Sequence, residues 1–111
     1  MKTLFERIIA RELPAEILFE DPSVIAIQDI HPVAPVHLLI ITKEVIPNIQ
    51  EMKREQLPIL GRIVEVAQEL AERFGVSDNY RLLTNCGHRA GQTIEHLHFH
   101  LIGGRSLGVM G

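Results

Sequence analysis

Between residues 95 and 102, histidine alternates with large apolar residues, and this alternation constrains the fold more than any other feature of the chain. Successive side chains of a β-strand point to opposite faces of its sheet, so the imidazoles would line one face at intervals of about 7 Å. The leucine and phenylalanine side chains between them would enter the core from the other face. We therefore predict a strand with a row of imidazoles on one side, formed by His96, His98 and His100.

Such a row is suited to nucleophilic or acid–base chemistry. The ordinary pKa of imidazole, about 6.5, lies close to neutrality, so one ring can be a neutral nucleophile beside a second ring that donates a proton. Two plainer alternatives stay open. The rings could bind a metal ion, although no acidic partner is obvious in the sequence, or they could be buried and hydrogen-bonded for structural reasons.

Length and composition indicate one domain, residues 1–111, in which 46% hydrophobic residues suffice for a core without disulfide bonds or a structural metal. The lone Cys86 favours a reducing compartment, and we expect a cytoplasmic protein. Charged residues interrupt the apolar N-terminus too early for a signal peptide, and no segment is apolar enough to cross a membrane. A net charge of −3 without a basic cluster argues against nucleic acid and favours a small ligand.

Periodicity and turn residues predict the order of the elements. Thr3 and Glu6 form a capping-box pattern that starts a short helix ending near Ala10. Apolar residues at three- and four-residue steps predict a long helix from about 55 to 74, with Pro58 in its first turns and Gly75 just past its end. Strand patterns cover 17–20, 24–28, 36–42, 80–85 and 97–102. This order predicts an α+β fold with a five-stranded antiparallel sheet, one long helix and a short N-terminal helix.

The segment before the histidine row has the composition of an anion-binding loop. Asn85 offers an amide, Gly87 and Gly91 allow the backbone to approach a ligand closely, and Thr93 offers a hydroxyl. Cys86 could suggest a cysteine–histidine nucleophile, but only the row itself could activate its thiolate. A nucleophile beside a phosphate-binding loop is a coherent site.

Residues 91–100, GQTIEHLHFH, and residues 29–37, DIHPVAPVH, form two motifs on either side of the long helix. Together they resemble the histidine triad superfamily, and in particular its purine nucleoside phosphoramidase branch. The likeness extends from the opening helix to the segment 103–105.

The resemblance implies a hydrolase of adenosine or guanosine 5′-phosphoramidates that releases AMP or GMP and an amine, with no cofactor and no metal. His98 matches the histidine that attacks the α-phosphorus and forms a nucleotidyl-histidine intermediate. His100 would lie near the leaving group, where Thr93 could help to protonate the departing amine. His96 and His37 match two supporting histidines that set the tautomer and orientation of His98.

The resemblance also implies the nucleotide contacts. Asn85 and the backbone amides near Gln92 and Thr93 would hold the phosphate, with Gly91 allowing its approach. Asp29 matches a carboxylate that binds the ribose hydroxyls, although a loop aspartate can simply cap its own loop. Two other histidines are expected to be solvated and outside the site, namely His31 and His88. Candidate walls for the purine are Ile27, Ile30 and Leu39.

Relatives of this branch form homodimers, and the resemblance implies that two sheets join here into one of ten strands. A second apolar strip on the long helix supports a subunit contact independently. Many relatives also carry an N-terminal cysteine pair for zinc, whereas Glu6 and Arg7 stand in that region here. A binding module that keeps nucleotide affinity, without a physiological need for catalysis, remains the alternative to an enzyme.

Overall fold

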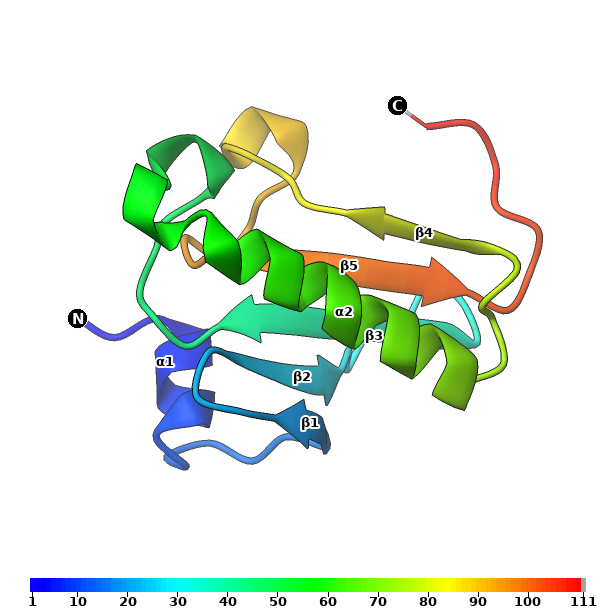
Figure 1. Cartoon of the computed structure of the whole chain (residues 1–111), viewed down its shortest axis with the longest axis horizontal. Coiled ribbons are helices and arrows are strands. Elements are labelled where there is room, and N and C mark those ends of the chain that lie inside the picture. Colours follow the sequence, from blue (N-terminus) through cyan, green and yellow to red (C-terminus); the bar gives the residue numbers. More distant parts are fainter. Residues whose placement is uncertain (111) are drawn as a thin grey trace.

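The computed structural model describes residues 1–110 and confirms the α+β fold. The five strands form one antiparallel sheet in the order β1-β2-β3-β5-β4 (Figure 1). Its elements in chain order are α1 (Leu4–Ile9), β1 (Ile17–Glu20), β2 (Val24–Gln28), β3 (Val36–Thr42), η1 (Ile49–Glu51), η2 (Arg54–Gln56), α2 (Pro58–Arg73), β4 (Tyr80–Leu83), η3 (His88–Ala90) and β5 (His98–Gly103), where η denotes a short 3-10 helix.

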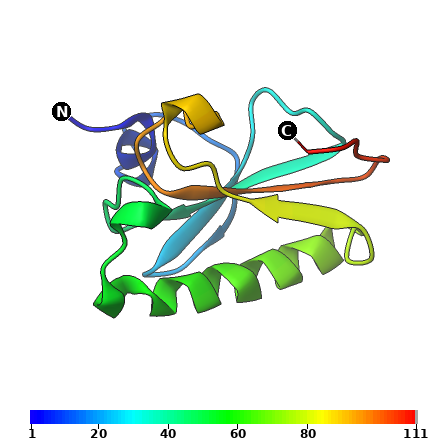
Figure 2. The ribbon, with the colours of Figure 1, turned by 90° about the horizontal axis from the view of Figure 1, so that it is seen from above.

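The two faces of the sheet are covered by different helices. Figure 2 shows α2 along one face and α1 on the opposite side of the sheet. Buried residues of α2 such as Ile63, Val66 and Leu70 pack against the first face. On the other face, Phe5 and Ile8 of α1 join the isoleucine and leucine side chains of β2 and β3. The site described below lies on the α1 side.

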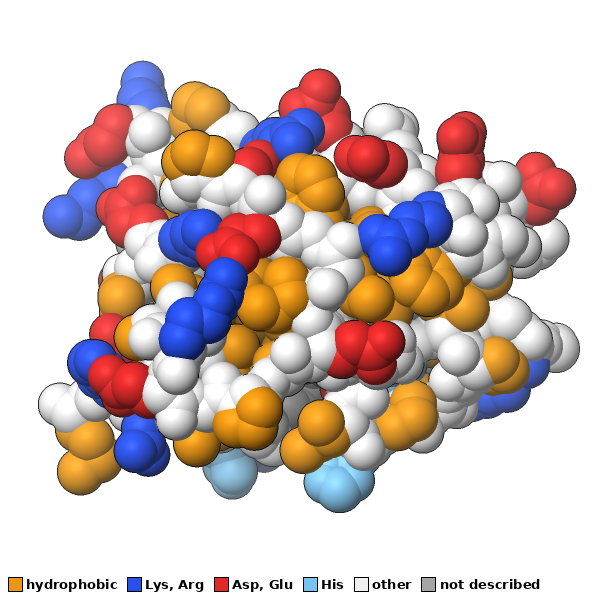
Figure 3. All heavy atoms as spheres, turned by 90° about the horizontal axis from the view of Figure 1, so that it is seen from below, with side chains coloured by type: hydrophobic (Ala, Val, Ile, Leu, Met, Phe, Trp, Pro, Cys, Tyr) orange, Lys and Arg blue, Asp and Glu red, His pale blue; other side chains and the backbone are white. Residues whose placement is uncertain are grey.

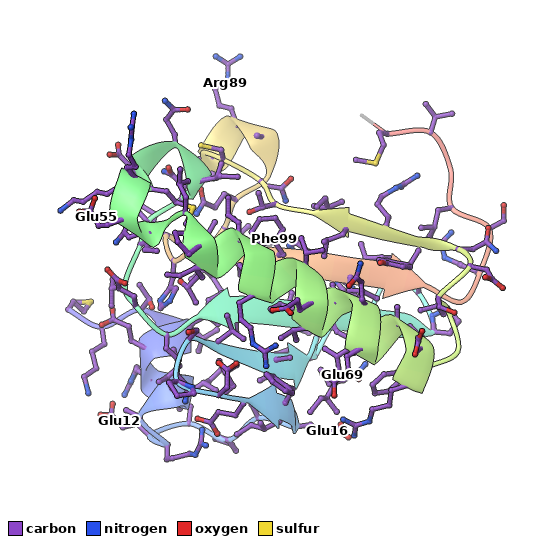
Figure 4. The ribbon with its side chains drawn as sticks, in the orientation of Figure 1. Glu12, Glu16, Glu55, Glu69, Arg89 and Phe99 are labelled. Atoms are coloured by element: carbon purple, nitrogen blue, oxygen red, sulfur yellow. The ribbon has the colours of Figure 1, made fainter. Side chains whose placement is uncertain are left out.

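Strand β3 is the centre of the sheet, and all seven of its residues are buried, which is typical of a strand whose sequence is nearly continuously apolar. Its partner β5 lies antiparallel to it, with Leu39 opposite His100 and Ile41 opposite His98. Phe99 packs with the α2 cluster on the opposite side of β5 (Figure 4). The predicted alternation of histidine and apolar side chains is therefore confirmed for residues 98–101 of β5.

Local sequence explains the ends of the helices. Both arms of the capping box at Thr3 and Glu6 are present, so α1 begins at Leu4. The long helix α2 begins at Pro58 rather than near 55, because proline is favoured at the first helical position, where its missing N–H is not needed. It ends before Gly75, whose φ of +74° is a left-handed value that other residues rarely adopt.

Two boundaries near the site differ from the prediction. Strand β4 ends at Leu83 instead of Asn85, and the next residue, Thr84, donates its hydroxyl to the carbonyl of His98 at 2.7 Å. His96 precedes β5 and is not part of that strand. Within residues 1–110, no helix has both the length and the apolar character needed to cross a membrane.

Candidate functional site

A cavity of about 380 Å³ lies on the α1 side of the sheet, with His98 and His100 of β5 in its wall. It brings together seven of the residues that the sequence predicts for the site, namely Ile27, Asp29, Ile30, Leu39, Thr93, His98 and His100. Figure 3 shows histidine side chains at the molecular surface beside hydrophobic ones. Mostly aliphatic walls with a few polar groups are typical of a pocket for a small organic ligand.

His98 is held in the tautomer that a nucleophile needs. Its ring is 7% exposed, and its Nδ1 lies 2.7 Å from the backbone carbonyl oxygen of His96. A carbonyl oxygen only accepts hydrogen bonds, so Nδ1 carries the ring proton and donates it. Burial lowers the pKa of His98 from its ordinary value, which keeps the ring neutral. The lone pair on Nε2 is therefore available for attack on an electrophile.

His100 takes the opposite tautomer because of its contact with His37. The backbone N–H of Val33 donates to Nδ1 of His37 at 3.1 Å, so the neutral ring of His37 carries its proton on Nε2. That Nε2 lies 2.9 Å from Nδ1 of His100, which accepts. His100 therefore carries its own proton on Nε2. Burial, reinforced by the neighbouring His98 and His37, lowers the pKa of His100 to about 4.

The ring of His96 does not enter the cavity. It is fully buried, its Nε2 lies 2.7 Å from the carbonyl oxygen of Thr42, and its Nδ1 lies 3.1 Å from the hydroxyl of Thr3. The sequence-based hypothesis gave the rings of His96 and His37 the task of orienting His98. In the structure the backbone carbonyl of His96 orients His98, while the ring of His37 contacts His100.

Asp29 combines the two roles that the sequence left open. Its Oδ1 accepts the backbone N–H of His31 at 2.7 Å, which closes the turn that follows β2. Its Oδ2 lies 3.3 Å from Nε2 of His37, and the residue lines the cavity. Asp29 therefore caps its loop with one oxygen and presents the other to the site.

A metal ion is the alternative use of these side chains. Ligand atoms of Asp29, His37 and His100 lie within 4.8 Å of one another. An ion on Nε2 of His37 would require the ring proton on Nδ1, yet Nδ1 already accepts the N–H of Val33. Both ring nitrogens of His96 are also engaged elsewhere. The donor geometry therefore fits a hydrogen-bonded relay better than a metal centre.

The loop before the row is held together by Gln92. The side-chain oxygen of Gln92 accepts the N–H of Gly87 at 2.8 Å, and its amide nitrogen donates to the carbonyls of Pro47 at 2.8 Å and Ile94 at 3.0 Å. Its backbone N–H donates to the carbonyl of Gly87 at 3.1 Å. The loop itself therefore uses the backbone N–H of Gln92, one of the groups that the sequence-based prediction assigns to phosphate.

Other loop residues keep positions compatible with anion binding. Thr93 is exposed and lines the cavity. Gly91 has a φ of +104°, and a Cβ atom placed there would lie 3.5 Å from Nδ2 of Asn85, so these two residues are neighbours. Arg89 points outward from η3 (Figure 4). Of these loop residues only Thr93 lines the cavity, whereas Asn85 and Gly91 are not among its lining residues.

Sequence reasoning missed the contribution of α1. Leu4, Phe5 and Ile8 line the cavity, and the ring of Phe5 meets His98 edge-on with 4.9 Å between the ring centroids. The capping box predicts that this helix forms, but nothing local predicts which face of the sheet it covers. His31, expected outside the site, is exposed but lies at the cavity rim.

Comparison with known proteins gives the family. The HIT domain model matches residues 10–107. The chain is 44% identical over 110 residues to the purine nucleoside phosphoramidase of Escherichia coli K12, covering 98% of this chain and 92% of that protein. It is also 44% identical over 105 residues to an uncharacterized HIT-like protein of Synechococcus elongatus, covering 95% of this chain and 92% of the other.

Solved structures agree with these matches. A HIT family hydrolase from Clostridium thermocellum superimposes with a TM-score of 0.93 at 50% identity, covering 97% of this chain and 95% of that one. A HIT family hydrolase from Legionella pneumophila also gives a TM-score of 0.93, at 40% identity with 96% of each chain covered. With nearly the whole length matched in sequence and in structure, the chain belongs to the HIT domain family.

Proposed function

We propose that this protein hydrolyses the P–N bond of adenosine or guanosine 5′-phosphoramidates and releases AMP or GMP with a free amine. The observation that supports this most is His98, a buried neutral imidazole whose Nδ1 donates to a carbonyl and whose Nε2 is left with a lone pair in a ligand-sized cavity. The name of the Escherichia coli relative points to the same substrate class.

In the first step, Nε2 of His98 attacks the α-phosphorus and a new N–P bond forms as the P–N bond to the amine breaks. The electron pair of the broken bond stays on the amine nitrogen, which then takes a proton. Nε2–H of His100 and the hydroxyl of Thr93 are donors in the cavity wall. Without such a donor the amine would have to leave as a strongly basic anion.

In the second step, water attacks the phosphorus of the nucleotidyl-histidine intermediate. An O–P bond forms, the N–P bond breaks, and the electron pair returns to Nε2 of His98. The proton that water loses restores the donor used in the first step. The carbonyl of His96 holds Nδ1–H of His98 throughout, so the ring keeps the orientation that both steps need.

Other residues of the cavity wall, together with residues of the loop that leads to the histidine row, would hold the nucleotide. Oδ2 of Asp29 is placed to accept hydrogen bonds from ribose hydroxyls, since Oδ1 is already used by the loop. Asn85, Thr93 and the backbone near Gly91 would hold the phosphate oxygens. The purine would lie against the aliphatic wall formed by Ile27, Ile30 and Leu39.

The test is hydrolysis of a fluorogenic adenosine phosphoramidate in the presence of EDTA, with mass spectrometry of the protein after rapid acid-free quenching. We expect turnover that the chelator does not change and a covalent adduct of one nucleoside monophosphate on His98. His98→Ala should lower kcat/KM by about 10³-fold or more, because it removes the nucleophile. His88→Ala, in the exposed η3 turn, is the matched control and should keep its activity.

Two outcomes would overturn the proposal. Activity that disappears with the chelator would favour the metal alternative. An active protein without an adduct at residue 98 would exclude covalent catalysis by this histidine. Calorimetry with His98→Gly separates binding from chemistry, because the ribose and phosphate contacts remain and AMP should still bind.

We also propose a homodimer in which two sheets join edge to edge into ten strands. β4 is the outer strand beside β5 and offers its free edge (Figure 1). On α2, Val64 is 46% exposed, and Leu57 just before the helix is 47% exposed.

Light scattering tests the proposed dimer and should give about twice the chain mass of 12.5 kDa. Val64→Lys should shift the protein toward monomer, whereas Glu69→Lys on the same helix should not; a monomeric wild type would contradict the proposal.

A further inference from the structure

We propose that Thr3 is a positioning residue of the active site, through a hydrogen bond from its hydroxyl to Nδ1 of His96. The two atoms lie 3.1 Å apart although the residues are 93 positions apart in the sequence. The inference rests on the proposed function of His98. It adds that Thr3, near the N-terminus, helps to align His98 through His96. Thr3 itself touches neither the cavity nor the reacting atoms.

The direction of this hydrogen bond follows from the other partner of the ring. Nε2 of His96 lies 2.7 Å from the carbonyl oxygen of Thr42, which can only accept, so Nε2 carries the proton. In the neutral ring Nδ1 is then an acceptor, and the Thr3 hydroxyl must donate to it. The same hydroxyl oxygen accepts the N–H of Glu6 at 3.1 Å, so both of its functions are used.

Two contacts hold the hydroxyl where His96 needs it. The Glu6 carboxylate accepts the backbone N–H of Thr3 at 2.9 Å, which completes the capping box and fixes the Thr3 backbone. Phe5, in the first turn of α1, meets the ring of His96 edge-on with 5.9 Å between centroids. The Thr3 hydroxyl and the Phe5 ring therefore both contact the ring of His96 from the N-terminal end of α1.

The hydrogen bond from Thr3 would affect catalysis through the backbone carbonyl of His96. Its ring is fixed at both nitrogens, so its carbonyl oxygen, 2.7 Å from Nδ1 of His98, is fixed as well. A ring that loses one anchor can tilt, and this carbonyl then tilts with it. Small misalignments of a nucleophile are costly because the reacting atoms must approach along a narrow path.

The test combines steady-state kinetics with ¹⁵N NMR of the ring nitrogens of His96. Thr3→Val keeps the shape but removes the donor, and we expect kcat to fall about tenfold, the size of one lost hydrogen bond, with KM changed less than about twofold. Thr3→Ser restores the donor and should recover kcat to within about twofold. In ¹⁵N spectra of the histidine rings at pH 7.5, wild type should show protonated Nε2 and hydrogen-bonded Nδ1, and only Nδ1 should move in Thr3→Val.

The control separates positioning from the stability of α1. Ile9 packs on the same cluster from α1 but lies outside the cavity, so Ile9→Ala loosens the helix without touching the hydrogen bond. We expect a lower melting temperature for Ile9→Ala with kcat within about twofold of wild type. An equal loss of kcat in Ile9→Ala and Thr3→Val would reduce Thr3 to a structural cap and overturn the inference.

The spectra test the inference even where activity does not. Wild-type His96 with its proton on Nδ1 would overturn the inference whether or not Thr3→Val folds. If wild type fails to cleave the phosphoramidate while the ring of His96 shows the expected pattern, the proposed function fails and the hydrogen bond stands.

Discussion

At the scale of residues, the chemistry of the site depends on which nitrogen of each ring meets a group with a fixed role. A backbone carbonyl meets Nδ1 of His98 and makes it a donor, whereas a backbone N–H meets Nδ1 of His37 and makes it an acceptor. His100 is then set by His37. Backbone groups cannot change their role with pH, so this arrangement would keep one ring as nucleophile and its neighbour as proton donor in the proposed mechanism.

Gln92 has a structural role in the loop that precedes the histidine row. It is 5% exposed, and its side chain makes three hydrogen bonds that tie the loop to Pro47, Ile94 and Gly87. We expect Gln92→Leu to lower the free energy of unfolding by about 2–4 kcal/mol, because buried backbone groups lose their partners. KM should rise as the loop near Gly91 loosens.

The measurement is urea unfolding followed by circular dichroism, together with steady-state kinetics. Gln50→Leu is the matched control, since Gln50 is exposed in η1 and its replacement should change stability by less than about 0.5 kcal/mol. Equal stability of the two variants would show that the Gln92 hydrogen bonds contribute nothing net.

The sequence predicts the two histidines that line the cavity better than the residues that support them. His98 and His100 follow from a two-residue period that a strand turns into one face, and both line the cavity. Thr3 and Phe5 could not be predicted as neighbours of the row, since nothing in a local pattern encodes contacts across more than 90 positions. The structural role of Gln92 could not be predicted for the same reason, because its partner Pro47 comes from a distant segment.

At the scale of elements, local sequence signals predicted which helices and strands form, whereas tertiary packing decided where each of them lies. The capping box and the strand patterns at 17–20, 24–28 and 36–42 predicted elements that the structure confirms. The start of α2 was predicted three residues early, because residues 54–56 form a separate 3-10 turn before Pro58. The face of the sheet that α1 covers needed the structure, and that face contains the site.

At the scale of the whole molecule, burying the imidazoles ties stability to pH. Burial lowers the pKa of His96, His98 and His100 in the folded protein, in the last case from 6.5 to about 4. Between these values the unfolded chain binds more protons than the folded one. Stability is therefore complete above about pH 6.5 and falls as the pH drops toward the lowered pKa.

The loss of stability at low pH can be predicted in size and measured on the whole protein. Between pH 7.5 and pH 5, the shift of His100 alone should lower the free energy of unfolding by about 2 kcal/mol, and the other two rings should add to that loss. Over the same interval the carboxylates of Glu20 and Asp21 contribute little, because ion pairs lower their pKa and they titrate below pH 5. Urea unfolding at the two pH values measures the difference.

His100→Gln should reduce this pH dependence, because the unfolded chain then has one fewer proton to gain, while His31→Gln at the exposed rim should leave it unchanged. The comparison depends on the slope between the two pH values and not on the absolute stability of either variant. A wild type whose unfolding free energy stays constant from pH 7.5 to pH 5 would mean that the rings are protonated equally in both states. The neutral nucleophile on which the proposed mechanism depends would then lose its physical basis.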